Sequence, residues 1–470
     1  MTTAVQERAE SGFPDGLEAV VGELKRRFGG RLSTSQAVRE QHGHTLTWLP
    51  NQPPDAVVFA ETTEDVADVV KLCAAHRVPV IAFGAGSSLE GHLNAPYGGV
   101  SVDLSRMTRI IDVHHGDLDC VVEAGVTRQQ LNEYLRDTGL FFPIDPGAEA
   151  TLAGMAATRA SGTNAVRYGT IRENVLNLTA VMASGEIIKT AQRARKSAAG
   201  YDLTHLLVGS EGTLGIITEL TLRLYGIPEC ILAAVCPFKT IEGACNTVME
   251  TIQMGLGMAR IELLDALQVK ACNEYSNLSL EERPTLFLEF HGSQAGAREQ
   301  VETFREIAES EGAGELEWAE REEDRNKLWK ARHDVYWSAR GLRPGAEPVV
   351  SDVCVPISRL AECVSETEAD LKRSDLLAPL VGHVGDGNFH LEILIDRNDA
   401  EEVRTMEAFL ERLVQRALAM EGTCTGEHGI GVGKMHFLED ELGSAVDVMA
   451  AIKRSLDPLN ILNPGKIVRI

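Results

Sequence analysis

Apolar positions between residues 51 and 140 follow two different periods, which predicts strands alternating with helices. Thr62 and Asp65 have the spacing of a helix start, and Val66, Val69, Val70 and Cys73 then line one helix face. Short apolar runs between the helical patterns predict strands. The expected elements are a helix that begins after Thr62, a helix at 127–138, and strands at 78–83, 100–104 and 120–124.

Composition changes divide the rest of the chain. A helical lead-in is expected over residues 1–50, and the Pro-bearing turn at 51–54 ends it. Residues 143–225 are rich in Gly, Ala, Ser and Thr and predict turns with only short elements, as is typical of a segment that wraps a large ligand. After Pro228 the pattern predicts an α+β domain. Its expected elements are helices at about 297–311, 358–373 and 399–421 and strands at 285–290 and 389–396.

Length and charge narrow the class of protein. A chain of 470 residues is expected to form two or three domains. The net charge of -24, from 69 acidic and 45 basic residues, disfavours nucleic acid as a partner. No apolar run is long enough to span a membrane, and the first residues lack the pattern of a secretion or transit signal.

The nine cysteines are odd in number and scattered, without a C-x-x-C pair. This argues against a disulfide framework and against a thiolate metal site. A cytoplasmic location follows as the expectation, and peripheral association with a membrane is left open.

A glycine-rich loop follows the strand predicted at 78–83. Backbone N–H groups in such a loop can surround a pyrophosphate, and glycine leaves room for its oxygens. The dinucleotide fingerprint G-x-G-x-x-G fails, because Leu89 stands where the third glycine belongs, and this argues against a nicotinamide enzyme. The alternative is a plain turn. The loop residues are Gly84, Ala85, Gly86, Ser87 and Ser88.

Further loops of small residues occur at 142–147, 160–169, 200–203 and 209–217. Each carries single polar groups among glycines, which suits a flat aromatic ring that needs backbone hydrogen bonds along its edge. Any one of them could be an ordinary Gly/Ser loop. Together, after a phosphate-type loop, they indicate a large cofactor.

Two histidines and a glutamate form a candidate metal set. His383 and His390 flank a tight Gly-Asp-Gly turn, and Glu427 follows later with His428 beside it. Two imidazoles and a carboxylate leave an open position for substrate and suit zinc, with manganese or iron as alternatives. Such a cation would polarise a substrate hydroxyl. The competing interpretation is that each histidine is an ordinary structural residue.

Together these segments resemble the vanillyl-alcohol-oxidase-type flavoproteins, and 145–174 resembles the D-lactate dehydrogenases that pass electrons to cytochromes. The resemblance covers nearly all of the chain after residue 50. It implies an α+β fold with an FAD-binding domain of the PCMH type over 51–228. Residues 229–470 would be an FAD-linked-oxidase C-terminal domain that binds substrate and metal, with its last segment returning to the flavin. FAD is expected to be bound non-covalently, with His92 as the alternative attachment point. The implied FAD contacts are Gly84, Ala85, Gly86, Ser87, Ser88, Pro146, Gly147, Ser161, Gly162, Asn164, Gly169, Glu211, Gly212, Ile217 and Asn463.

The same resemblance assigns roles to single residues. The metal ligands carry over to His383, His390 and Glu427, and the general base carries over to His428, a residue type that titrates near neutrality. Arg332 matches an arginine that fixes the substrate carboxylate with its bidentate fork. The alternative for Arg332 is a surface residue on a helix. Asn463 lies in a C-terminal signature, and its alternative role is an ordinary turn.

Two positions bear on the substrate. Related D-2-hydroxyglutarate enzymes carry a lysine where this chain has Val350 and an asparagine where it has Glu392. In a strand, His390 and Glu392 share a face. A carboxylate there is expected to repel a dicarboxylic acid, so the prediction is a small monocarboxylic D-2-hydroxy acid such as D-lactate.

The expected reaction uses Arg332 and the metal to orient the substrate while His428 removes the hydroxyl proton. C2 then delivers hydride to flavin N5, giving a 2-keto acid. An external acceptor, either a cytochrome, a quinone or an electron-transfer flavoprotein, would take the electrons. The alternatives are a glycolate oxidase flavin subunit, a D-2-hydroxyglutarate dehydrogenase, a metal-dependent hydrolase and a non-catalytic binding protein. Whether two copies form a homodimer is left open.

Overall fold

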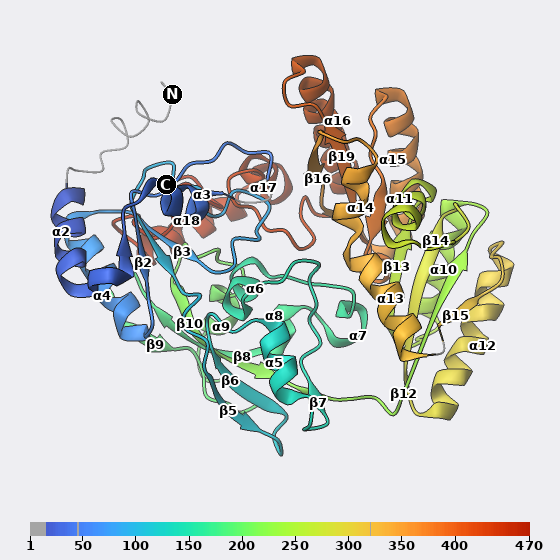
Figure 1. Ribbon diagram of the computed structural model, residues 1–470, viewed down its shortest axis with the longest axis horizontal. Helices are drawn as coiled ribbons and strands as arrows, with labels where there is room; N and C mark the ends of the chain where they lie inside the picture. Colours follow the sequence, from blue (N-terminus) through green and yellow to red (C-terminus); the bar gives the residue numbers. More distant parts are fainter. Residues whose placement is uncertain (1–15, 45–46, 320) are drawn as a thin grey trace. The chain divides into compact units, whose positions relative to one another are not determined.

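The computed structural model describes residues 16–44, 47–319 and 321–470, which form two compact units (Figure 1). Unit 1 comprises the residues up to Ser161, Thr170–Gly226 and Glu427–Ile470. Unit 2 comprises Gly162–Gly169 and Ile227–Gly426. The chain therefore passes between the units four times. No helix in the described ranges has both the length and the apolar character needed to cross a membrane.

The first sheet of unit 1 has the strand order β1-β2-β4-β3, with β2, β4 and β3 parallel. The helix α4 begins where the sequence predicts, because Thr62 Oγ1 accepts from the amide of Asp65 at 3.1 Å. The C-terminal segment lies beside β3, where Val80 N donates to Ile461 O at 2.7 Å. The elements here are β1 (Leu32–Ser33), β2 (Ala56–Phe59), β3 (Val80–Phe83), β4 (Val100–Asp103), α2 (Leu17–Phe28), α3 (Gln36–Gly43) and α4 (Thr63–His76). The lead-in predicted over 1–50 is helical at α2 and α3, while its residues 1–15 and 45–46 lie outside the described ranges.

The second sheet of unit 1 is antiparallel, with the order β5-β6-β10-β8-β9. The expectation of only short elements in 143–225 was wrong, since β8 and β10 span seven and eight residues. Polar residues such as Thr221, whose hydroxyl donates to Asn177 Oδ1 at 3.0 Å, interrupt the apolar pattern of these strands. The strands are β5 (Ile110–His114), β6 (Asp119–Glu123), β8 (Val175–Val181), β9 (Ile187–Lys189) and β10 (Ile216–Arg223).

The remaining elements of unit 1 are short helices and one two-stranded ribbon, formed by β7 and β11. The helix predicted at 127–138 is present as α5, which begins with a complete capping box of Thr127 and Gln130. The bounds are α5 (Arg128–Leu135), β7 (Leu140–Phe141), α6 (Leu152–Thr158), α8 (Ile171–Asn174), α9 (Leu203–Leu207), β11 (Tyr225–Gly226), α17 (Met435–Leu442) and α18 (Ala445–Leu456).

Unit 2 is built on an eight-stranded antiparallel sheet with the order β15-β12-β14-β13-β18-β19-β16, and β17 also pairs with β19. The predicted strands at 285–290 and 389–396 are confirmed as β14 and β19. The strands are β12 (Cys230–Pro237), β13 (Met258–Leu264), β14 (Thr285–Gly292), β15 (Glu317–Ala319), β16 (Glu347–Val350), β17 (Val353–Cys354), β18 (Leu380–Gly382) and β19 (Asn388–Ile395).

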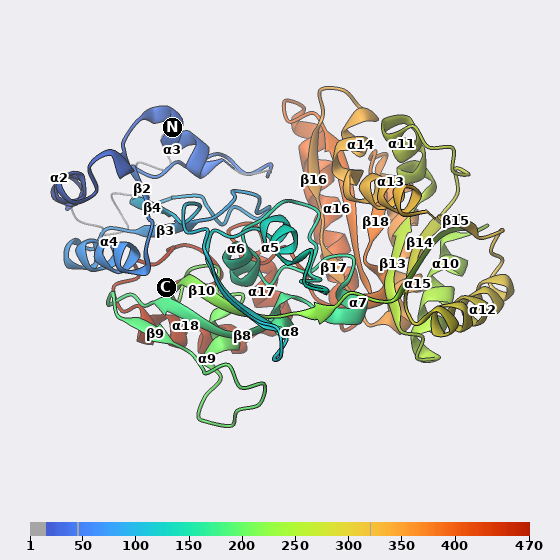
Figure 2. The ribbon, with the colours of Figure 1, turned by 60° about the horizontal axis from the view of Figure 1, so that its bottom comes forward.

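Helices cover both faces of this sheet (Figure 2). On β14, Phe287 packs against Trp329 on one face, and Phe290 packs against Phe304 on the other. The long helices predicted after Pro228 are confirmed as α12, α15 and α16. The helices are α7 (Ala165–Tyr168), α10 (Ile241–Gln253), α11 (Ala266–Ser276), α12 (Gln294–Ser310), α13 (Glu322–His333), α14 (Val335–Gly341), α15 (Leu360–Ser374) and α16 (Ala400–Ala419).

Candidate active site

The glycine loop in unit 1 leaves the end of β3 and runs without a helix or strand to β4. A Cβ on Gly84 would collide with Thr151 Oγ1, and Gly86 has a φ of 73°, so both positions require glycine. Ser88 Oγ is buried and has no hydrogen-bond partner within the described ranges. A loop with close backbone approach and an unsatisfied buried hydroxyl fits a polar ligand such as a pyrophosphate.

Most of the other predicted FAD residues of unit 1 lie on loops, and Ile217 lies in a strand. Ser210 Oγ is buried without a hydrogen-bond partner among the residues described, and the next residues are Glu211 and Gly212, both with positive φ. A second loop therefore presents an unsatisfied polar atom, as an FAD site requires. Pro146 and Gly147 lie between β7 and α6, Ser161 follows α6, Glu211 and Gly212 lie between α9 and β10, and Ile217 is in β10.

The side chain of Glu211 is already engaged by the protein. Its carboxylate accepts from Ile430 N at 2.7 Å and from Gly431 N at 2.8 Å, and it lies 3.4 Å from His92 Nε2. Burial opposes ionisation, but the charge of His92 and these hydrogen bonds together hold the pKa of Glu211 below its ordinary value. Glu211 thus anchors the C-terminal segment just after His428, and its contact with FAD stays a prediction.

Asn463 binds the same loops. Its amide group donates to His92 O at 3.1 Å and to Glu211 O at 2.8 Å, while its Oδ1 accepts from Lys466 Nζ at 3.0 Å. Burial lowers the pKa of Lys466 to about 7. The C-terminal signature therefore returns to the glycine loop of unit 1, and a direct contact of Asn463 with the flavin stays a prediction.

The predicted FAD residues Gly162, Asn164 and Gly169 belong to unit 2. Asn164 Oδ1 accepts from Arg260 Nε at 3.1 Å, and the Tyr168 hydroxyl lies 2.8 Å from His291 Nδ1. These contacts hold the segment on β13 and β14, which residue spacing in the sequence does not reveal. Their role in binding FAD stays a prediction.

The two predicted metal-ligand histidines lie together in unit 2, with ring centroids 5.5 Å apart. Gly387 closes the turn between them with a φ of 78°, and a side chain there would collide with Val355 O. Nδ1 of His383 lies 2.9 Å from the Glu262 carboxylate, and Nδ1 of His390 lies 3.1 Å from Ser351 O. An acceptor of the protein therefore faces Nδ1 of each ring.

The carboxylate of Asp352 lies next to the ring of His390. It lies 3.6 Å from His390 Nδ1 and accepts from Asn388 Nδ2 and Thr425 Oγ1, each at 2.7 Å. Gly426 packs against the same group, since a Cβ there would lie 3.0 Å from Asp352 Oδ1. The segment that ends unit 2 is therefore fixed beside the strand that carries His390.

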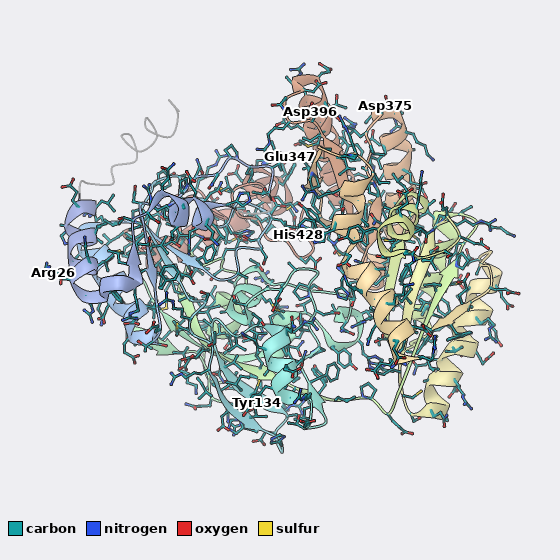
Figure 3. The ribbon with its side chains drawn as sticks, in the orientation of Figure 1. Arg26, Tyr134, Glu347, Asp375, Asp396 and His428 are labelled. Carbon is teal, nitrogen blue, oxygen red and sulfur yellow. The ribbon has the colours of Figure 1, made fainter. Side chains whose placement is uncertain are left out.

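Glu427 and His428 are the first two residues of the final part of unit 1 (Figure 3 labels His428). Both are half-buried, and His428 Nε2 lies 3.9 Å from Glu427 Oε1. They stand between Gly426, held in unit 2, and Ile430, held by Glu211 in unit 1. Both predicted functional residues thus lie on a short link with an anchor at each end.

Arg332 is buried on α13, so the alternative of a surface residue was wrong. Its Nη2 donates to Glu262 Oε2, whereas its Nε is buried and has no hydrogen-bond partner in the described part of the chain. A buried N–H that lacks an acceptor fits a clamp for a substrate carboxylate. Glu262 was missed in the sequence, although an acid inside the apolar run of β13 is a usable signal.

The two positions predicted to set the substrate are cross-strand partners, because Val350 on β16 pairs with Glu392 on β19. Glu392 is buried close to Arg332. Burial raises the pKa of Glu392 to about 8, against the lowering effect of Arg332. Glu392 is therefore mostly protonated at neutral pH, and burial rather than the charge of Glu392 makes a substrate carboxylate costly at this place.

Replacing Glu211 with alanine is expected to loosen the link that carries His428. Each of the two amides would lose one hydrogen bond to a buried charge, worth about 1.5–3 kcal/mol, so exchange at Ile430 and at Gly431 should speed up by about 10–100-fold. Hydrogen exchange followed by mass spectrometry measures this. Glu219→Ala, on β10 with a hydrogen bond from Thr179, serves as the control. Equal protection in both variants would contradict the anchor.

The lowered pKa of Glu211 predicts that its contribution to the stability of the protein depends on pH. The pKa of Glu211 is lowered in the folded chain, so its stabilising effect is fully present above the ordinary value of about 4.3. That stabilising effect is lost as the pH falls through the pKa that Glu211 has in the folded chain. The difference in unfolding free energy between the wild type and Glu211→Ala should therefore shrink on acidification below that point, and a constant difference would argue against it.

Comparison with known proteins agrees with this arrangement. Residues 54–191 match the profile of an FAD binding domain, and residues 227–467 match the C-terminal domain of FAD linked oxidases. A solved structure of p-cresol methylhydroxylase with substrate bound has a TM-score of 0.82, covering 97% of this chain and 98% of that one. Because the two chains are only 16% identical, this similarity shows the fold alone. The predicted α+β fold with its two domain types is confirmed.

Two relatives are similar over nearly the whole chain. “Probable D-lactate dehydrogenase, mitochondrial” of Danio rerio is 53% identical, covering 97% of this chain and 92% of that protein. “D-lactate dehydrogenase (cytochrome), mitochondrial” of Arabidopsis thaliana is 45% identical, covering 96% and 80%. The chain belongs to the FAD-dependent D-lactate dehydrogenase family of the vanillyl-alcohol-oxidase-type flavoproteins. It is an FAD-dependent oxidoreductase, whereas its cytoplasmic location stays a prediction.

Proposed function

We propose that this chain oxidises D-lactate, or a similar small monocarboxylic D-2-hydroxy acid, to the 2-keto acid. The names of both relatives support the substrate, and the name of the plant relative supports a cytochrome as electron acceptor. The observation that carries the site is the histidine pair of unit 2, in which His383 and His390 each have Nδ1 facing a fixed acceptor. That arrangement is typical of imidazoles prepared to bind a metal through Nε2.

A divalent cation would be held by His383, His390 and Glu427. Ligand nitrogens of the two histidines lie within 4.8 Å of each other, which suits one ion with bonds of about 2.0–2.1 Å to imidazole. Glu427 follows Gly426 directly, and one peptide link of about 3.8 Å keeps it next to the segment fixed on Asp352. Zinc is the first candidate, with manganese and iron as alternatives. When bound, the cation supplies polarisation of the C2 hydroxyl.

The side chains of this chain then perform three tasks. Arg332 binds the substrate carboxylate through its unsatisfied Nε–H, which fixes the orientation of C2. His428 takes the hydroxyl proton on a ring nitrogen as the C–O bond becomes a carbonyl. The C2–H bond breaks with its electron pair, and bound FAD supplies the acceptor for that hydride. Substrate thus loses one proton and one hydride, which balances the formation of a 2-keto acid.

The first experiment is an anaerobic visible spectrum of the purified protein before and after addition of D-lactate. We expect flavin absorption that bleaches with D-lactate and persists with L-lactate. Removal of metal with a chelator should slow the bleaching, and zinc or manganese should restore it. A colourless protein that takes up no FAD, or a flavin that D-lactate leaves oxidised, would overturn the proposal.

A further inference from the structure

One buried acid, Glu262, joins two groups that the proposed function treats separately. It lies on β13 with 1% of its surface exposed, between Ile261 and Leu263. We infer that Glu262 is a positioning residue that holds both the metal ligand His383 and the carboxylate clamp Arg332. The inference rests on the proposed function and adds that metal affinity and substrate binding depend on the same carboxylate.

Both partners contact the carboxylate of Glu262. His383 Nδ1 lies 2.9 Å from both Oε1 and Oε2, and Arg332 Nη2 donates to Oε2. Both partners are donors, so a carboxylate, with two acceptor oxygens, satisfies both at once. A carboxamide has one acceptor and one donor group, and its NH2 would face a donor.

Backbone pairing explains why the three side chains meet. Leu263 of β13 pairs with Gly382 of β18, which places the next residue, His383, beside Glu262. The turn after His383 is held against β13, since a Cβ on Gly385 would lie 2.6 Å from Ile261 Cγ2. His383 therefore has little freedom to move away from the carboxylate. A carboxylate that accepts the Nδ1 proton fixes the tautomer and makes Nε2 a stronger metal ligand.

The neighbouring strand provides a matched comparison. Glu289 on β14 is also buried, accepts from His291 Nε2 at 2.7 Å, and lies 3.5 Å from Arg260 Nη1. This second Glu–His–Arg set has the same residue types and also a buried acid and histidine, although Arg260 is more exposed than Arg332. Neither His291 nor Arg260 is assigned to the metal or the substrate. A purely structural effect of losing a buried acid should therefore be equal at Glu262 and Glu289.

The test compares Zn²⁺ and Mn²⁺ affinities of the metal-free full-length wild type, Glu262→Gln, Glu262→Asp and Glu289→Gln, by titration calorimetry. We expect Glu262→Gln to weaken metal binding by about 10–100-fold, with partial recovery in Glu262→Asp. Glu289→Gln should keep the wild-type affinity. Unchanged affinity in Glu262→Gln, or an equal loss in Glu289→Gln, would overturn the inference. A wild type that binds no metal would overturn the proposed metal centre and this inference with it, and that outcome is visible before any variant is made.

A second measurement does not depend on the metal. Long-range ¹H–¹⁵N spectra of the metal-free protein report which ring nitrogen carries the proton, and His383→Gln assigns the signal. We expect the Nδ1–H form of His383 in the wild type and a shift toward the Nε2–H form in Glu262→Gln. The KM for D-lactate should also rise in Glu262→Gln, because Arg332 loses its acceptor. A tautomer and a KM that both stay as in the wild type would contradict the positioning role, and Glu262→Asp allows both tests if Glu262→Gln fails to fold.

Discussion

Replacing His428 with glutamine is expected to lower the rate of FAD reduction by D-lactate by about 10²–10⁴-fold, because a general base contributes about that much. Glutamine keeps much of the volume of histidine but cannot accept a proton near neutral pH. The anchors on either side, Gly426 at Asp352 and Ile430 at Glu211, do not involve this side chain. Stopped-flow measurement of flavin bleaching at saturating D-lactate gives the rate directly.

The matched control for this variant is His205→Gln. His205 also lies in unit 1, is partly exposed, and forms its contacts with Asp202 and Arg172 O. Both variants should bind FAD and unfold at the wild-type temperature, and only His428→Gln should slow the reduction. If flavin reduction in His428→Gln proceeds at the wild-type rate, His428 is not the base.

Periodicity predicted those elements whose residues follow a simple repeat. The helix after Thr62 and the strand before Gly84 are both in place, because an apolar face and an N-cap are local properties. The strands β8 and β10 were missed for the opposite reason. The buried threonine hydroxyls of β10 find their acceptors on β8, and that pairing cannot be read from a short window.

The candidate site shows the same division between local and distant information. His383 and His390 flank one short turn, with His390 in β19, so their spacing alone brings them together. Glu262 is distant from both in the sequence and meets His383 only through the pairing of β13 with β18. Gly162–Gly169 lies within a stretch of unit 1 sequence, yet contacts of Asn164 and Tyr168 assign it to unit 2.

Two buried glutamates, one in each unit, hold in place the residues that are proposed to contact the substrate and the metal. Glu211 fixes the segment that follows His428, and Glu262 fixes His383 and Arg332. In each case the carboxylate accepts from two donors of the protein, and hydrogen bonds to a charged group are among the stronger ones. The groups proposed to contact substrate and metal are thereby held in fixed orientations, which is the condition for fast chemistry.

Exchanging the cross-strand pair Val350 and Glu392 for lysine and asparagine is expected to shift selectivity toward D-2-hydroxyglutarate. The two residues face each other across β16 and β19, where side chains are about 4.5–5.5 Å apart at Cβ. Glu392 is buried near Arg332 in surroundings that disfavour a negative charge, so we expect the distal carboxylate of a dicarboxylic substrate to bind poorly there. The double variant removes that acid and supplies a cation.

A hydrogen bond to a charged group contributes about 1.5–3 kcal/mol, so the ratio of kcat/KM for D-2-hydroxyglutarate over D-lactate should rise by about 10–100-fold. Val350→Met with Glu392→Asn is the neutral control, because methionine has a similar length without the charge. That control should raise the ratio less than the lysine variant does. If the lysine variant retains D-lactate oxidation with an unchanged ratio, the β16–β19 pair does not contact the distal end of the substrate, and selectivity between mono- and dicarboxylic acids must be set elsewhere.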